Sequence, residues 1–407
     1  MLLCCICLSK KKGNDKQKEK VKIVYCLNSI GKLGGMEKIT ISKANALARI
    51  PGNQVWIIVA SSEEPPLLPL ENVSVVHLDV HYYEEDWRGY WFAMMDCFKK
   101  VKIHKKLAEK VLNEIGPDIL ISIGNNEKRF LHKLRITSNP ALVKEIHMEK
   151  RYRTKNAHSW KGKLFAKMAE WYEFSHTSKK YDKIVLTTKA DKTGSWENWD
   201  KVTIIPNSVS PYLGKMSDCE SKTAISAGRL HSLKNFQSLI NVWKLVHLKH
   251  PDWKLQIWGE GEERKKLQNQ IERMGLTNVV QLMGYTPDLR KKMSEASVFV
   301  LSSLSEAFSL VTVEAMSVGI PTVAYRCSGG LRYVVKEGNT GFLVPENDEK
   351  AFADRVCLLI ENDGQRKAMG KAAFEESRKY ATENIISQWM SLFDDLLEKK
   401  QRIHNFS

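Results

Sequence analysis

The chain has 407 residues, 43% of them hydrophobic and 9% aromatic, which is the composition of a soluble globular protein long enough for two domains. Its 63 Lys and Arg residues exceed its 47 Asp and Glu residues, and the net charge of +16 favours anionic partners such as nucleotides or anionic lipid head groups. No apolar run approaches the roughly 18 residues of a membrane span. Apart from Cys4, Cys5 and Cys7, the eight cysteines are scattered with no CxxC pair, and they suggest neither a zinc site nor a disulfide framework.

Residues 1–20 are expected to form a disordered basic tail. Their apolar stretch is too short for a secretory signal, and its charges follow it, so we expect a cytoplasmic protein. Cys4, Cys5 and Cys7 allow two interpretations, a segment that carries lipid or contacts a membrane, or a plain tail.

Residues 21–208 alternate short apolar strands with helical patterns, which indicates a parallel sheet covered on both faces. A glycine-rich loop at 31–35 follows the first strand and precedes a helix expected over 36–48. The expected strands are 21–27, 54–60, 73–78, 118–123, 141–146 and 183–187.

The pattern restarts after a polar stretch at 209–222, so a second domain is expected over 209–383. Its expected strands are 223–227, 253–258, 278–282, 297–301 and 321–325. Its helices are expected from about 234 and over 262–274, 349–361 and 364–380, with a last helix at 384–399.

Two doubly wound α/β domains in tandem place a ligand between them, at the carboxyl ends of their strands. Three loops at such ends are polar or rich in glycine. They form the candidate site and cover 31–35, 228–234 and 302–309.

The third loop opens the segment SEAFSLVTVEA, which sets Glu306 and Glu314 eight positions apart. Glu306 follows an apolar strand, and Glu314 lies inside an apolar helix candidate. A carboxylate in such surroundings costs free energy unless a partner hydrogen-bonds it. A ligand rich in hydroxyl groups is the simplest partner.

Four motifs carry a family resemblance: GKLGGMEK, AGRLHSLKN, SEAFSLVTVEA and GNTGFLV. Together they resemble family 4 of the retaining, nucleotide-sugar-dependent glycosyltransferases, over about residues 21–400. The resemblance implies the GT-B fold, in which two Rossmann-like domains face a cleft and the C-terminal helix, here 384–400, joins the first domain. It also implies a role in polysaccharide biosynthesis, as in building lipopolysaccharide, capsule or lipid-linked glycans.

The resemblance implies that Arg229 and Lys234 stabilise the departing diphosphate in place of a metal ion, so that no metal and no cofactor are expected. The alternative for these two residues is a pair of solvated surface cations. Glu314 is implied to bind the ribose hydroxyls, and Glu306 the hydroxyls of the donor sugar. The alternatives are a surface charge favoured by the helix dipole for Glu306 and a buried ion pair for Glu314.

Backbone N–H groups at Phe308, Ser309 and Leu310 are expected to open a helix and meet phosphate or sugar oxygens. One turn departs from the family. Arg332 or Tyr333 stands where the family commonly has an acid, which puts recognition of the base or sugar on that side in doubt.

Gly34 and Gly35 are implied to border the acceptor and the donor phosphates, although a pair of glycines is also a common turn. His147, at a strand end, is implied to face the donor sugar, with a satisfied structural histidine as the alternative. Gly284 and Tyr285 are the expected contacts of the nucleotide base.

We therefore expect an enzyme that moves a sugar from a nucleotide-diphosphate sugar to a hydroxyl of a glycan or lipid-linked glycan, with retention of configuration. UDP is the expected nucleotide, rather than GDP or ADP. No nucleic-acid partner is expected, because the chain has no aromatic-basic RNA motif, zinc spacing or basic helix. Two rivals remain, a basic nucleic-acid-binding protein and a catalytically idle relative that binds nucleotide or serves as a scaffold subunit.

Two segments, 87–98 and 160–172, mix aromatic residues with flanking lysines. Interfacial helices have this composition. Core helices whose lysines reach solvent look the same in sequence. Peripheral attachment to an anionic membrane surface, at the inner face of the cytoplasmic membrane, is therefore a hypothesis.

Overall fold

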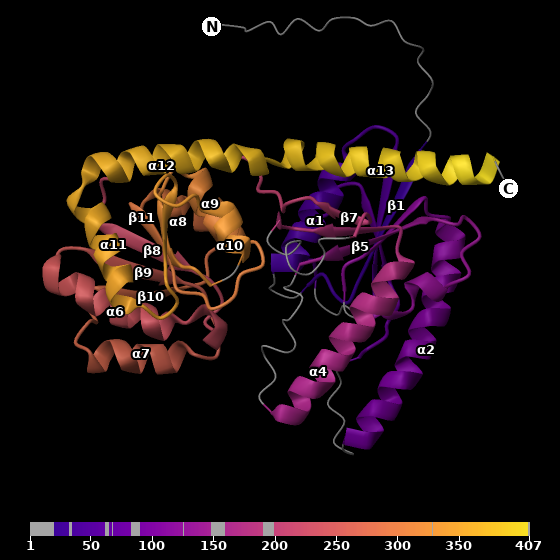
Figure 1. Ribbon diagram of the computed structural model, residues 1–407, viewed down its shortest axis with the longest axis horizontal. Coiled ribbons are helices and arrows are strands. Elements are labelled where there is room, and N and C mark those ends of the chain that lie inside the picture. The colour runs from indigo at the N-terminus through magenta and orange to yellow at the C-terminus, as the bar shows by residue number, and fades with distance from the viewer. Residues whose placement is uncertain are drawn as a thin grey trace, which may run out of the picture.

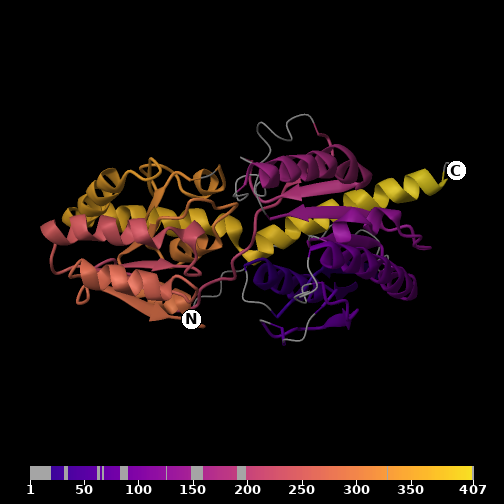
Figure 2. The same ribbon diagram turned by 90° about the horizontal axis from the view of Figure 1, so that it is seen from below.

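The computed structural model forms two parallel sheets that lie side by side along the longest axis (Figures 1 and 2). This arrangement confirms the expected α/β fold with two doubly wound units. The residues that the structure describes are 20–31, 35–61, 65–66, 68–82, 90–124, 126–147, 159–189, 199–327 and 329–405. The tail cysteines and Gly34 lie outside them.

The first sheet has the order β3-β2-β1-β4-β5-β6-β7, with every neighbouring pair parallel. Its central strands are buried on both faces because their residues are almost all apolar. Its strands are β1 Val21–Leu27, β2 Asn53–Val59, β3 Val73–His77, β4 Ile119–Ser122, β5 Ala141–Ile146, β6 Lys183–Leu186 and β7 Val202–Ile204.

The second sheet has the order β10-β9-β8-β11-β12-β13 and is also parallel. Two clusters of buried apolar side chains cover its two faces. Its strands are β8 Thr223–Ala227, β9 Lys254–Trp258, β10 Val280–Gly284, β11 Val298–Leu301, β12 Thr322–Tyr325 and β13 Gly341–Val344.

An α-helix connects each pair of successive strands in the second half, and α-helices also follow β1, β3 and β5 in the first half (Figure 1). Those of the first half are α1 Gly35–Ala48, α2 Tyr90–Ile115 and α4 Trp160–Tyr172. Those of the second half are α6 Phe236–Lys249, α7 Arg264–Arg273, α8 Leu289–Ser294, α9 Leu310–Ser317, α10 Gly329–Val334, α11 Glu349–Glu361 and α12 Asp363–Ser377. No helix in the described part of the chain has both the length and the apolar composition that crossing a bilayer requires.

The last helix, α13 (Thr382–Asn405), leaves the second half and packs against α1 of the first (Figure 1). Its buried residues Ile385, Trp389 and Phe393 recur every four positions, so they share one face of the helix. They join the same apolar cluster as β1 and β2. A single amphipathic helix thus ties the end of the chain to the first sheet.

The structure contains short elements that the sequence did not reveal. They are β7, β13, α8 and α10, none longer than six residues. Such lengths hold too few repeats for a hydrophobic period to be recognised. The helix expected from about residue 234 begins instead at Phe236, because Asn235 takes a left-handed conformation with φ of 51°.

Candidate functional site

The strand orders place β1 beside β4 and β8 beside β11, so each sheet has one point at which the chain reverses its direction of travel. Loops at the carboxyl ends of strands flanking such a point diverge and leave room for a ligand. Two of the three expected site loops follow β8 and β11, and the third leads from β1 into α1.

Lys234 is held in the β8 loop by close packing of backbone. A Cβ on Gly228 would lie 3.2 Å from the Cε of Lys234, so the lysine side chain runs directly over this glycine. A Cβ on Gly259 would lie 1.9 Å from the carbonyl oxygen of Gly228, which excludes any side chain there. Arg229 is exposed on the same turn. Lys234 itself lies in a short turn ahead of α6 and not at the first residue of that helix.

Lys234 and Glu306 meet across the β8 and β11 loops, with 2.6 Å between Nζ and Oε1. The hydroxyl of Ser302 donates to the carbonyl oxygen of Lys234, and the N–H of Leu304 donates to that of Leu233. These bonds fix the two loops against each other, so the contact between the cation and the carboxylate is part of the local fold.

The loop after β11 leads into α9 through Ser309, which has a left-handed backbone with φ of 59°. The side chain of Phe308 is buried and packs edge-on against Tyr380, so it faces the core. Leu310 is the first residue of α9. A ligand contact through the backbone N–H groups of these residues stays a prediction.

Glu314, on α9, meets the first half of the chain. Its Oε1 lies 2.7 Å from the Nζ of Lys38 on α1, and only 12% of its side chain is exposed. The tip of Leu310 lies 3.8 Å from a Cβ built on Gly35, at the start of α1. The start of α1 and α9 thus face each other. The structure therefore gives Glu314 the lysine partner of the ion-pair alternative, but the pair is not buried, because 49% of the Lys38 side chain is exposed. Sequence reasoning did not identify Lys38.

Gly284 ends β10, and its carbonyl oxygen accepts a hydrogen bond from the N–H of Gly259. Through Gly259 it is connected to the Gly228 turn. Tyr285 is exposed beside it. The expected strand 278–282 is therefore shifted by two residues, and Gly284 belongs to the strand instead of following it.

His147 follows β5 and has a largely buried side chain whose Nε2 lies 3.0 Å from Oε1 of Glu145. Glu145 is also paired with the buried Lys43 of α1. Burial acts to raise the pKa of Glu145, but Lys43 and His147 outweigh it and hold that pKa at about 2. Burial lowers the pKa of Lys43, against the attraction of Glu145.

The side of β5 next to His147 borders a pocket that sequence reasoning missed. Glu173 bridges two lysines there, at 2.8 Å from Lys144 and 2.9 Å from Lys128. Burial acts to raise the pKa of Glu173, but the two lysines hold it at about 2. The lining residues are Met36, Ser122, Ile123, Gly124, Lys128, Lys144, Glu145, Ile146, His147 and Glu173.

Glu127 precedes Lys128, one of the lining residues, and is buried. Its Oε1 accepts a hydrogen bond from Ser122, whereas Oε2 has no hydrogen-bond partner among the described residues. Burial raises the pKa of Glu127 to about 7. The sequence did contain a signal for the charged residues of the pocket. Lys144 and Glu145 interrupt an apolar strand, and charges inside such a strand need partners.

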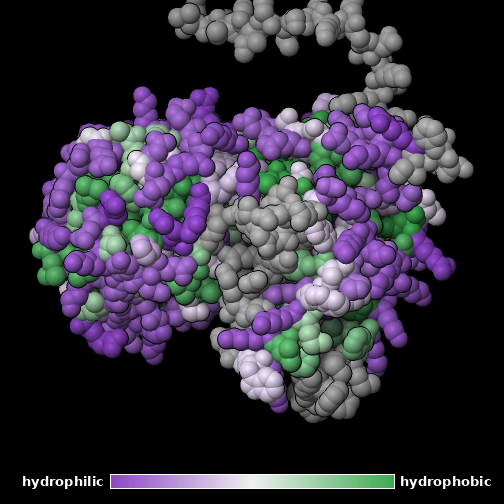
Figure 3. Space-filling model, in the orientation of Figure 1, coloured by the Kyte–Doolittle hydropathy of each residue, from purple (hydrophilic) through white to green (hydrophobic). Residues whose placement is uncertain are grey.

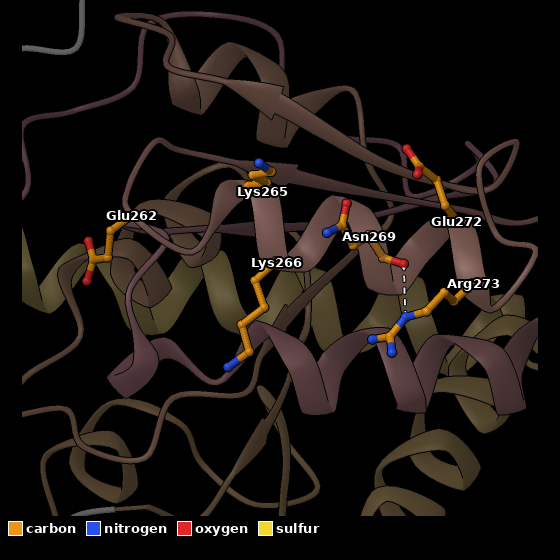
Figure 4. A pocket seen from close by; sticks show the side chains of 6 residues that line it. All are labelled: Glu262, Lys265, Lys266, Asn269, Glu272 and Arg273. Atoms are coloured by element: carbon orange, nitrogen blue, oxygen red, sulfur yellow. Dashed lines mark hydrogen bonds between the residues drawn. The ribbon is translucent and has the colours of Figure 1, made fainter.

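A wider depression lies along α7 and is lined mostly by that one helix (Figure 4). One lining residue, Glu262, lies 3.6 Å from His231 of the β8 loop. Its side chains point in different directions, and Arg273 donates to the backbone carbonyl of Asn269. The depression therefore lacks convergent groups. Within the described part of the chain, no three His, Cys, Asp or Glu side chains are grouped to hold a metal ion.

Solved structures resemble this chain over nearly its whole length. Sucrose-phosphate synthase from Thermosynechococcus elongatus superposes with a TM-score of 0.77 at 18% identity and covers 93% of this chain and 100% of its own. Staphylococcus aureus TarM in complex with Fondaparinux, alpha-GlcNAc-glycerol and UDP has a TM-score of 0.71 at 15% identity, covering 92% and 99%. At these identities the likeness establishes the fold, which is the expected GT-B arrangement.

Sequence comparison carries the family assignment. The family described as glycosyl transferases group 1 matches residues 216–376, which include the loops after β8 and β11. An uncharacterized glycosyltransferase of Haemophilus influenzae is 30% identical over 375 residues, which span 91% of this chain and 99% of that protein. The chain therefore belongs to the group 1 family of glycosyltransferases.

Proposed function

We propose that this glycosyltransferase moves a sugar from a nucleotide-diphosphate sugar, with UDP as the nucleotide, to a hydroxyl of a glycan or lipid-linked glycan, with retention of configuration. The observation that carries the proposal is the contact of Lys234 with Glu306 where the strand order reverses. A cation and a carboxylate at one such point suit a ligand that is both anionic and rich in hydroxyls. The UDP in the TarM complex supports the choice of nucleotide.

On the donor side, Lys234 and Arg229 stabilise the negative charge that develops on the diphosphate as it leaves. These fixed cations act in this proposal without a metal ion or other cofactor. Glu306 accepts hydrogen bonds from the donor sugar, and Glu314 from the ribose. Since Glu314 contacts Lys38 in the structure, the ribose hydroxyls either join this ion pair or displace the lysine.

Retention is proposed to follow from attack on the face that the diphosphate leaves. The bond between the anomeric carbon and the phosphate oxygen breaks, and the acceptor oxygen forms its bond to that carbon on the same side. The proton of the acceptor hydroxyl passes to an oxygen of the departing diphosphate. Closure of the two halves excludes water and limits hydrolysis of the donor.

On the acceptor side, the pocket beside His147 is proposed to receive the acceptor hydroxyl. It opens next to Met36, in the first turn of α1, the helix that faces α9. Lysines 128 and 144 there share the single carboxylate of Glu173. Buried and ion-paired side chains hold their geometry, which suits the positioning of a nucleophilic hydroxyl.

Thermal unfolding with UDP, GDP and ADP, followed by donor hydrolysis and transfer assays, tests the proposal. UDP at one hundred times its Kd adds about 2.7 kcal/mol of stability. The anomeric configuration of the product, read by NMR, tests retention. Stabilisation by UDP without hydrolysis or transfer would favour the catalytically idle relative, and stabilisation by none of the three nucleotides contradicts the donor assignment.

A further inference from the structure

Helix α4 presents a row of large apolar side chains to solvent. Trp160, Leu164, Phe165, Met168, Trp171 and Tyr172 each expose between 52% and 72% of their surface. They are six of the thirteen large apolar residues that are exposed in the described part of the chain. Such a concentration on one helix of 13 residues marks an interaction surface rather than ordinary scatter.

The exposed apolar residues lie on one side of α4, within an arc of about 140° at 100° per residue. The opposite side carries Gly162, Ala166 and Glu170, four positions apart, and these are the residues that the rest of the protein covers. The core-helix interpretation of segment 160–172 is therefore wrong. The helix packs with its small and acidic side and leaves its aromatic side outward.

Basic residues accompany this apolar side. Lys161, Lys163 and Lys167 are exposed on the same helix, and Lys161 lies 5.6 Å from the ring centre of Trp160. The acidic residues of the segment are drawn inward, since Glu170 is buried and Glu173 pairs with Lys128 and Lys144. The outward surface of α4 is therefore apolar and cationic.

The position of the helix connects this surface to the acceptor pocket. Glu173, directly after α4, belongs to the buried ion pairs that line the pocket. Trp160, at the other end, lies about 20 Å away at 1.5 Å per residue. In Figure 1, α4 runs from the first sheet toward the lower edge of the molecule, and Figure 3 shows apolar surface at that edge.

We propose that the outward side of α4 docks the protein onto an anionic lipid bilayer surface. Tryptophan and tyrosine combine an apolar ring with a polar group, and together with lysine they are the residues that favour the bilayer interface. The aromatic side chains enter the head-group region, and the lysines contact anionic head groups. The pocket side of the first half then lies close to the membrane.

A second copy of the chain fits this surface less well. In a two-fold dimer the same patch contacts itself, so the lysines of the two copies approach one another. No exposed acidic side chain of α4 compensates them. An anionic bilayer provides both the apolar interior and the opposite charge.

Flotation of the full chain with vesicles of phosphatidylcholine, with and without phosphatidylglycerol, tests the proposal without any substrate. The protein is expected to float with the anionic vesicles at low salt and to be released at about 1 M salt, where the Debye length is about 3 Å. Replacing three apolar residues (Trp160→Ser, Phe165→Ser and Met168→Ser) should weaken binding at least about tenfold. The control, Leu213→Ser with Leu248→Ser, removes apolar residues elsewhere that are even more exposed, and it should bind like the unaltered protein.

A second variant separates charge from apolar contact. Lys161→Gln, Lys163→Gln and Lys167→Gln together should weaken binding by about fivefold per lysine. UDP-induced thermal stabilisation and the circular dichroism spectrum should be unchanged in all variants, because these side chains lie on the surface. Any one of three results overturns the proposal. These are no flotation at low salt, equal flotation of the Trp160/Phe165/Met168 variant and the control, or a dimer that this variant abolishes without any vesicle binding. Since binding is measured without donor or acceptor, its failure leaves the proposed reaction untouched.

Discussion

The two halves of the molecule build their candidate sites in different ways. In the second half, Arg229 and Lys234 share one turn, and Glu306 and Glu314 share one loop and helix. In the first half, the buried charges come from elements that are far apart in sequence, since Glu145, which lines the pocket, pairs with Lys43, 102 residues away. The proposed donor site is thus built from residues that are close in sequence, whereas the proposed acceptor site depends on ion pairs between residues that are far apart in sequence. The two sites should therefore respond differently to substitution.

The largest expected effect is on the stability of the first half. Lys43→Met removes the lysine that pairs with the buried Glu145 and should lower the free energy of unfolding by about 3–5 kcal/mol. The ammonium of Lys43 also lies 4.2 Å from the ring centre of Trp389, so its loss weakens the attachment of α13. Urea unfolding followed by fluorescence measures the effect.

Two controls accompany this substitution. Lys43→Met combined with Glu145→Leu removes both charges and should recover most of the stability, because no unpaired charge remains. Lys222→Met breaks an exposed ion pair with Asp252 and should leave the free energy of unfolding almost unchanged, because solvent screens the pair. Equal losses from the Lys43 and Lys222 substitutions would mean that the buried pair contributes no more than a surface pair.

A pH dependence of similar size should come from Glu127. Its pKa is about 7 in the folded protein, because of burial, against about 4.5 when unfolded. Between these values the folded protein keeps a proton that the unfolded chain has lost. Stability therefore falls as pH rises through this window, by about 3 kcal/mol in total, and levels off above pH 7.

The contribution of Glu127 is isolated by comparison with Glu127→Gln, which cannot titrate. The comparison is needed because burial lowers the pKa of His104 to about 4, and that residue makes stability rise with pH up to about 6.5. The difference in unfolding free energy between the two proteins, measured from pH 5 to pH 8, should decline and then become flat. A difference that is constant across this range contradicts the raised pKa.

The donor side should lose activity rather than stability. Lys234→Ala removes the cation proposed to stabilise the leaving diphosphate and should lower kcat/KM by a factor that corresponds to about 2–4 kcal/mol. The unfolding midpoint should fall less than in the Lys43 variant, because Lys234 is partly exposed whereas Lys43 is buried. Lys244→Ala, an exposed lysine on α6, is the control. Activity equal to that of the control would identify Lys234 as an ordinary surface cation.

The same contrast explains what the sequence made predictable. Apolar strands such as β1 and β8 need no distant partner to be recognised, so the fold class and most elements could be predicted. Lys234 and Glu306 could be proposed because each lies in a loop that follows a clearly apolar strand. Lys38 and Glu173 could not be proposed, because each is recognised only by its ion-pair partner, which is distant in sequence and close only in the folded chain. Strands as short as β7 also escaped recognition, because three residues carry no period.

The smallest expected effect concerns the contact between the halves and separates two roles for Glu314. If Glu314 binds ribose, Glu314→Ala should weaken UDP binding by about 1.5–3 kcal/mol, the range for hydrogen bonds to a charged group. Lys38→Ala should change UDP binding by less than about 1 kcal/mol, because nearly half of the lysine side chain is exposed and the pair is screened. Calorimetric titration of both variants with UDP measures the difference. If Glu314 only paired with Lys38, the two substitutions would change UDP binding equally. A larger effect at Glu314 would mean that the carboxylate holds the ligand while Lys38 only closes the gap between the two halves.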